Sequence, residues 1–279
     1  MKKQLFYILL TIGFVIVISK TNAQKVYINI NSGYGFSAGS QSLNNYKKQG
    51  ESYTSDFKIK INHIKYSLGK GINTNATIGF ILNKNINIEL GFGYLIGSKI
   101  EYHDINNALP GVTVTKNFKS NMPYFIPSLV LKSGFKKINP YAKVGIFIGI
   151  PKVTSEYIED NLSIMQEKLE INTEYKMDWG LGANTCIGVI YEISKKIGFL
   201  GECKILNLAV TPKSSEYTKY SIDGKDRLLT MNTNEKKQIY LNELTLDSST
   251  LNSSEPAKLM KYKMPFSSIG ANIGIKIKF

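Results

Sequence analysis

Apolar and polar residues alternate along most of the chain with a period of two residues. In the segment 26–36 most even positions are apolar or aromatic, whereas most odd positions are asparagine or glycine. This period is typical of β-strands whose two faces meet different surroundings. Eight segments show it: 26–36, 72–82, 86–96, 122–132, 140–150, 179–193, 198–210 and 269–279. Because the glycine and asparagine face cannot form an oily core, the apolar face is expected to point outward.

The connections between these strands alternate between short and long. Short turns lie near Lys84, Lys137 and Lys196. The long polar loops are 37–63, 103–120, 154–172 and 213–261. This layout predicts an all-β, up-and-down antiparallel transmembrane β-barrel of eight strands, or ten if the last loop adds strands, with long extracellular loops and short periplasmic turns. A soluble barrel, the alternative, would turn its apolar face inward.

The first residues have the parts of a secretory signal peptide. Lys2 and Lys3 precede an apolar run from Leu5 to Ile18, and the small residue Ala23 follows a short polar stretch. The run is shorter than the roughly 20 residues of a membrane-spanning helix, and no later run approaches that length. We expect residues 1–23 to be removed on export and residues 24–279 to form one barrel domain in the outer membrane of a Gram-negative cell.

The chain is strongly basic, with a formal net charge of +14. Three of these charges belong to the leader, at Lys2, Lys3 and Lys20, so +11 remains on residues 24–279. The lysines are scattered or paired, and they do not form the long run of a nucleic-acid-binding arm. The expected partners are therefore outer-membrane lipid and lipopolysaccharide, which carry anionic groups, and not nucleic acid.

The inward face of the predicted barrel carries several charged residues. They are Glu89, Lys99, Lys143, Glu192, Lys276 and Lys278, with Glu202 and Lys204 as further candidates. An eight-stranded barrel is just wide enough for side chains to fill its interior. Because a buried charge is tolerated only when it is paired, these residues are expected to form a structural plug rather than an ion pathway.

The two cysteines fall on opposite faces of neighbouring predicted strands. Cys186 is inward, whereas Cys203 shares the parity of Phe199 and Ile205 on the outward face. Residues that pair across a hairpin share a face, so no disulfide is expected between the two cysteines.

Catalytic chemistry has little support in the sequence. The chain has two histidines, His63 and His103, and only His103 has acidic neighbours, at Asp104 and Glu101. A neighbouring His-Asp pair in a loop is usually solvated, and successive strand residues point to opposite faces. No His or Cys cluster has metal-ligand spacing, and no glycine-rich loop opens a helix as phosphate sites require. We therefore predict a non-enzymatic protein with no catalytic residue, metal site or cofactor.

Short motifs lie in and beside the two middle predicted strands, 122–132 and 140–150. They are Tyr124-Phe125-Ile126-Pro127, Lys132, Asn139-Pro140-Tyr141, Gly145 and Gly149. Together with the C-terminal strand they resemble the porin-like family of outer-membrane β-barrels, whose small members have the eight-stranded OmpA/OmpX-type fold. The last-strand pattern of that class matches Asn272, Gly274, Ile277 and Phe279, with Ile277 in place of the more usual aromatic residue. The resemblance implies that the barrel-insertion machinery reads this strand by adding it to its own sheet edge.

The longest loop, from Lys213 to Lys261, is the candidate surface for an extracellular partner. Tyr217, Tyr220 and the turn Asp223-Gly224 predict a hairpin that projects above the membrane. The expected function is envelope structure or surface interaction through such loops. A narrow passive channel is the alternative, and an enzyme built at the rim around His63 or His103 is the third hypothesis.

Overall fold

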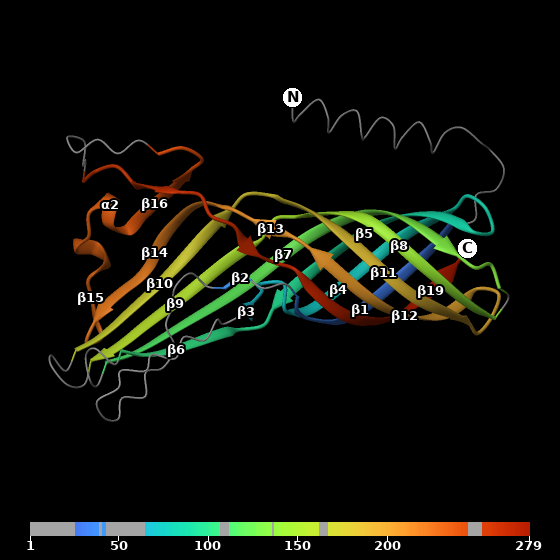
Figure 1. The fold of residues 1–279 in the computed structure, drawn as a ribbon, viewed down its shortest axis with the longest axis horizontal. Coiled ribbons are helices and arrows are strands. Elements are labelled where there is room, and N and C mark those ends of the chain that lie inside the picture. Colours follow the sequence, from blue (N-terminus) through green and yellow to red (C-terminus); the bar gives the residue numbers. More distant parts are fainter. Residues whose placement is uncertain are drawn as a thin grey trace, which may run out of the picture.

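Eight long antiparallel strands form a closed barrel in the computed structural model (Figure 1). The structure describes residues 26–38, 41–42, 65–106, 112–135, 137–161, 167–244 and 253–279. The barrel strands are β1 (Val26–Ser37), β4 (Gly71–Ile81), β5 (Ile86–Gly97), β7 (Val112–Lys132), β8 (Ile138–Gly149), β11 (Gly180–Glu192), β12 (Ile197–Asn207) and β19 (Ser268–Lys278). Each pairs with the next in this order, and β19 closes the ring against β1. The predicted all-β, eight-stranded fold is confirmed.

The short turns at one end of the barrel set the register of the strands that they join. Between β4 and β5, the side chain of Asn83 accepts hydrogen bonds from the backbone N–H groups of Asn85 and Ile86, each at 2.8 Å. Between β11 and β12, the Ser194 hydroxyl accepts from Lys196 and Ile197 in the same way. Such side-chain acceptors stabilise tight turns. We call this end of the barrel the turn rim and the opposite end the mouth.

The outer surface of the barrel is a belt of exposed apolar side chains. On β8, Val144 is 62% exposed, and Ile187 and Ile273 on other strands are 67% and 76% exposed. Exposed aromatic residues flank the belt: Phe36, Tyr94 and Trp179 near the mouth, and Phe135, Phe199 and Phe279 near the turn rim. A closed barrel with an apolar band and aromatic girdles faces lipid, so the soluble alternative is excluded.

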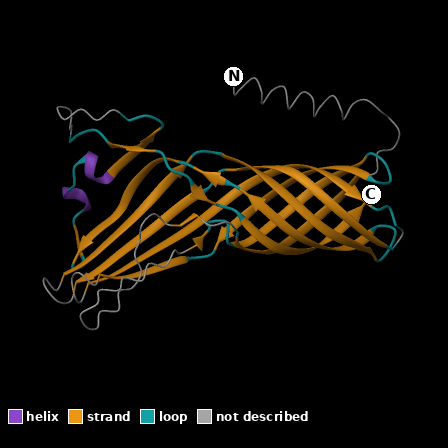
Figure 2. Cartoon of the chain, viewed as in Figure 1, coloured by secondary structure: helices purple, strands orange, loops and turns teal. Residues whose placement is uncertain are grey.

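One side of the barrel wall continues beyond the mouth as an open part of the same 15-stranded sheet (Figure 2). β7, which has 21 residues and is roughly 70 Å long at about 3.3 Å per residue, runs through both parts. The other strands are β6 (Ile100–Asn106), β9 (Lys152–Asn161), β10 (Glu167–Met177), β14 (Pro212–Ile222), β15 (Lys225–Asp226), β16 (Lys237–Leu241) and β17 (Ala257–Met260). The order is β17-β16-β14-β10-β9-β7, with β6 on β7 and β15 on β14. We call this part the projecting sheet.

The predicted loops at 103–120 and 154–172 are therefore wrong in conformation, because most of their residues lie in the projecting sheet, and the described part of 213–261 contributes β14, β15, β16 and β17 to the same sheet. Both faces of these segments are rich in polar residues, so they lack the apolar alternation by which a half-buried strand is recognised. The predicted hairpin in the last loop is confirmed. β14 pairs with β15 across a turn in which Asp223 and Gly224 have φ of 50° and 74°, as a tight two-residue hairpin turn requires. The ten-strand alternative is wrong, since these strands join the projecting sheet and not the barrel.

Short segments close over the mouth. β13 (Ala209–Val210) pairs with β18 (Met264–Pro265), and β2 (Gln41–Ser42) pairs with β3 (Lys65–Tyr66).

The helices η1 (Leu228–Thr230) and α2 (Thr233–Lys236) are short and lie between β15 and β16. No helix in the described part of the chain is long and apolar enough to cross a membrane. The predicted signal peptide, residues 1–23, and most of the predicted loop 37–63 lie outside the described residues.

Candidate functional site: the barrel interior and the projecting sheet

A buried charge network crosses the barrel interior. Lys143 on β8 places its Nζ 2.9 Å from Oε2 of Glu89 on β5 and 2.8 Å from Oε1 of Glu202 on β12. The side chains of these three residues are at most 6% exposed. None of the three strands is adjacent to another in the barrel, so the network ties opposite parts of the wall together.

Polar neighbours complete the hydrogen bonding of the two buried carboxylates. The Tyr27 hydroxyl and the Asn29 amide donate to Glu89 at 2.7 and 2.9 Å. The Tyr141 hydroxyl donates to Glu202 at 2.7 Å, and the amide of Asn272 reaches it at 3.5 Å. A buried ion pair is tolerated only with such additional partners. Each of the two buried carboxylates thus accepts hydrogen bonds from Lys143 or its neighbours inside the barrel.

The remaining predicted interior lysines lie in three different surroundings. Lys276 is buried, with its Nζ 3.4 Å from the centre of the Tyr27 ring, which is a cation–π contact. Lys278 pairs with Glu192 at 2.6 Å near the turn rim. Lys204 places its Nζ 5.1 Å from the Tyr124 ring centre and 5.9 Å from that of Phe147.

Lys99 does not belong to this interior set. It follows the end of β5 at Gly97, its side chain is 45% exposed, and it pairs with Glu101 at 2.7 Å. The prediction for Lys99 was wrong because it extended the alternation of inward and outward residues beyond Gly97, where β5 ends.

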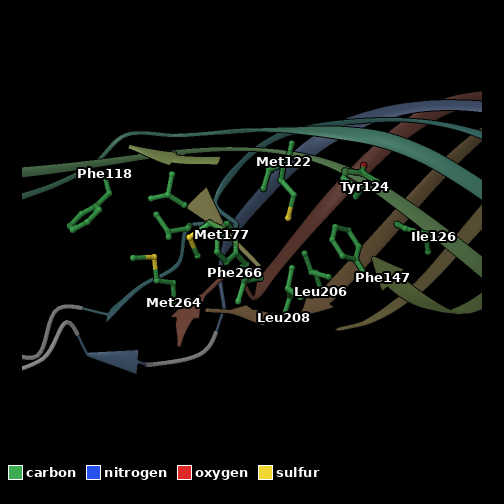
Figure 3. Packing of buried hydrophobic residues seen from close by; sticks show 14 residues of the cluster. Phe118, Met122, Tyr124, Ile126, Phe147, Met177, Leu206, Leu208, Met264 and Phe266 are labelled. Carbon is green, nitrogen blue, oxygen red and sulfur yellow. The ribbon is translucent and has the colours of Figure 1, made fainter. Parts of the chain in front are cut away.

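An apolar cluster fills the mouth end of the barrel and extends to the base of the projecting sheet (Figure 3). The cluster consists of Leu68, Leu95, Phe118, Met122, Tyr124, Ile126, Phe147, Val153, Met177, Leu206, Leu208, Val210, Met264 and Phe266. Leu68, Leu208 and Phe266 come from the segments that fold over the mouth, and their backbones are joined: Leu68 donates to Pro265, and Phe266 donates to Leu208. We call this cluster the mouth plug. The sequence analysis did not predict this cluster. Isolated apolar residues in otherwise polar connections, such as Leu68 and Phe266, were the signal that could have indicated it.

The space left inside the barrel is small. One cavity of about 20 Å³ lies among mouth-plug residues beside Lys204, and another of about 20 Å³ lies beside the charge network. Each has room for roughly one water molecule. Four side-chain amide oxygens that line the second cavity have no hydrogen-bond donor among the described residues: those of Asn31, Asn75, Asn184 and Asn272.

Glycines make room for the interior tyrosines. Tyr27 lies opposite Gly79 in the register of β1 and β4, and a Cβ atom on Gly79 would lie 2.1 Å from the tyrosine ring. Tyr124 covers Gly93 in the same manner, at 2.3 Å. Each ring therefore occupies the volume that a side chain on the neighbouring strand would need.

The cysteines and histidines lie apart from one another. Cys186 is buried in the interior and Cys203 is exposed on the outer face, and both are free, as expected. His103 lies in β6 opposite Thr115, and His63 lies outside the described residues. No group of three potential metal-binding His, Cys, Asp or Glu side chains occurs in the described part of the chain.

The last strand places the residues of the predicted assembly signal on both faces. Asn272 points inward to Glu202, whereas Ile277 is exposed on the outer face. Gly274 approaches the backbone of β1 closely, since a Cβ atom there would lie 2.3 Å from the Ile30 carbonyl oxygen. Phe279 is 72% exposed, and its N–H donates to the carbonyl of Val26.

The projecting sheet carries paired charges and stacked tyrosines. Lys168 and Lys219 both donate hydrogen bonds to Glu170, and these bonds lower the pKa of its carboxyl to about 2. A bulge opposite the Asn172–Thr173 step puts Tyr217 and Tyr220 on one face of β14, where their rings stack with centres 6.4 Å apart. The hairpin predicted from these tyrosines is thus one edge of a larger built surface.

The fold and the exposed belt define a transmembrane β-barrel with a filled interior. No protein-family model matches this sequence. No curated protein matches it either. The fold is similar to that of a major outer membrane protein from Thermus thermophilus, with 9% identity, 92% of this chain and 100% of that chain covered, and a TM-score of 0.45. It is also similar to Acinetobacter baumannii CarO2 (11% identity, 92% and 100% covered, TM-score 0.31) and CarO (12%, 90% and 97%, 0.29).

Proposed function

We propose that this chain is a non-enzymatic outer-membrane protein whose closed barrel anchors the projecting sheet at the cell surface. The observation that carries the proposal is the contrast between the two parts of the molecule. The interior is filled by the charge network and the mouth plug, whereas one side of the wall continues into a large sheet beyond the mouth. The sheet, with the described parts of the segment from Lys213 to Lys261, is then the surface for an extracellular partner.

The exposed belt supports the location in the membrane. Apolar and aromatic side chains surround the barrel, and the polar projecting sheet begins where the belt ends. A barrel wall of this kind needs lipid around it, and the outer membrane of a Gram-negative cell is the usual site of such barrels. The predicted leader and the predicted C-terminal assembly signal agree with export to that membrane.

A passive channel has weaker support. Water-filled channels need an open interior, but the cavities beside Lys204 and Lys143 have room for roughly one water molecule each. The ion pairs of Lys143 also span the interior, so a hydrated ion has no continuous path past them.

Thiol labelling of intact cells tests which end of the barrel faces outward. In a Cys203→Ala background, Lys225→Cys places a thiol on β15 at the far end of the projecting sheet, and Lys195→Cys places one in a turn-rim turn. A membrane-impermeant maleimide is expected to label the first variant and not the second in intact cells, and both after lysis. Labelling of only the turn-rim variant in intact cells would contradict the proposal.

A further inference from the structure

The outer face of the wall changes from apolar to basic at one height. Along β8 and β9, the outward residues Ile146 and Ile150 are 46% and 60% exposed, and the next outward residue is Lys152. On the neighbouring β7 the apolar outward residues end at Pro123, whose carbonyl accepts a hydrogen bond from the N–H of Ile150, and the partner of Lys152 is the neutral Asn121. The two strands therefore leave the belt together.

Three lysines lie side by side just above this boundary. Lys152 and Lys176 are direct partners in the register of β9 and β10, and Lys176 is in turn the partner of Ser214, next to Lys213. With strands about 4.8 Å apart, the row spans roughly 10 Å. Like charges that lie directly opposite each other on one face of a sheet are destabilising unless an anion compensates them.

The acids of the chain compensate this row only in part. Lys152 pairs with Glu174 at 3.0 Å. Asp178 is shared, because Lys261 lies 2.9 Å from it and Lys213 lies 3.7 Å from it. Among the described residues, Lys176 has no ion-pair partner. The surface thus keeps a net positive charge next to the apolar belt.

The surroundings of the row have the form of a lipid headgroup site. Trp179, 54% exposed, follows Asp178 at the mouth end of β11, where an indole ring favours the membrane interface. Above it, a surface hollow of about 370 Å³ is lined by Lys176, Ser214 and Glu216, among others. Acyl chains can lie on the belt while an anionic headgroup lies against the lysines.

We propose that Lys152, Lys176 and Lys213 bind the phosphate groups of a lipid of the outer leaflet. Charge complementarity carries the inference. The four lysines, which are the three of the row and Lys261, outnumber the two acids that pair with them, Glu174 and Asp178. This excess of positive charge lies at the height where lipid phosphates meet a barrel. The inference rests on the membrane location given above and adds a ligand class and its residues. The lipid packs against the wall below the projecting sheet and fixes the height of the barrel in the membrane.

Native mass spectrometry with diphosphoryl lipid A as the probe tests the site. The full chain is titrated in detergent micelles, as the unchanged protein and as the variant Lys152→Gln/Lys176→Gln/Lys213→Gln. The matched control is Lys225→Gln/Lys236→Gln/Lys258→Gln, which removes the same charge from the far part of the projecting sheet. A heat-dependent shift in electrophoretic mobility of every sample shows that each barrel is folded, independently of lipid binding.

We expect the row variant to bind diphosphoryl lipid A more than tenfold more weakly and the control to change less than twofold. We also expect lipid A without phosphates to bind weakly to all proteins, and inorganic phosphate not to compete at equal concentration. The proposed site is overturned by any of three results: the row variant binds diphosphoryl lipid A as tightly as the unchanged protein, the control loses as much affinity as the row variant, or lipid A without phosphates binds as tightly as diphosphoryl lipid A. Competition by inorganic phosphate overturns the lipid as its source. Loss of the mobility shift in the unchanged protein would instead contradict the barrel itself.

Discussion

Lys143 on β8 and Glu202 on β12 form a buried ion pair of 2.8 Å across the barrel, with β11 between their strands. Because Lys143 also holds Glu89, removing its charge leaves two buried carboxylates without a cation. We predict that Lys143→Met lowers the free energy of unfolding by about 3–5 kcal/mol. Urea unfolding of the protein in lipid vesicles, followed by tryptophan fluorescence, measures this loss.

The matched control neutralises the whole network. In Glu89→Gln/Lys143→Met/Glu202→Gln the three charges of the network are removed together, so the two carboxylates are no longer buried without a cation and most of the lost stability should return. If the triple variant is as unstable as Lys143→Met alone, burial of unpaired charge is not the reason for the loss.

Gly79→Ala is predicted to destabilise the barrel by about 1–3 kcal/mol, because the added methyl group displaces the Tyr27 ring and its hydrogen bond to Glu89. Gly201→Ala provides the comparison, since a Cβ atom at Gly201 meets no atom within 4 Å. The same unfolding assay should show Gly201→Ala close to the unchanged protein. Equal effects of the two substitutions would mean that the tyrosine does not occupy the glycine's side-chain space.

The carboxyl of Glu170 should titrate near pH 2, since hydrogen bonds from Lys168 and Lys219 favour its charged form. Its pKa is thus lower in the folded than in the unfolded protein. Its contribution to stability is present above the unfolded pKa of about 4.5 and is lost as the pH falls toward 2. Carbon-13 NMR titration measures the pKa, which should rise in Lys219→Gln and stay unchanged in Lys225→Gln. A value near 4.5 in the unchanged protein would show that these bonds do not persist.

Removal of Phe279 is predicted to impair assembly in cells more than stability in vitro. The side chain is mostly exposed and makes a small contribution to packing, whereas the resemblance gives it a role in recognition by the insertion machinery. Deletion of Phe279 should reduce the heat-modifiable protein in outer-membrane fractions several-fold, while refolding into vesicles is nearly normal. An equal loss in both assays would assign the residue a structural role instead.

The barrel could be predicted from the sequence because each of its strands meets two very different surroundings. Segments such as 140–150 alternate between lipid-facing isoleucine and an interior of lysine and glycine, so period and strand length were both visible. The exception was near Asn207, where the end of β12 was placed too late because the chain turns inward at Leu208 to join the mouth plug.

The projecting sheet and the pairing of the charges could not be predicted in the same way. Both faces of β9 and β10 carry polar residues, so neither face has the apolar signal that a core imposes. The odd–even alternation of residues along β8 correctly placed Lys143 in the barrel interior. The acids that Lys143 contacts depend, however, on the registers of the five strands from β5 to β12. Parity also could not show that β5 ends before Lys99.

The most direct test of a filled interior is single-channel recording in planar bilayers with refolded protein whose mobility shift shows it to be folded. The charge network and the mouth plug predict no discrete current steps over the full voltage range. Stable unitary steps from the unchanged protein would show a continuous aqueous path past Lys143 and would contradict the account of a closed barrel that anchors a surface sheet.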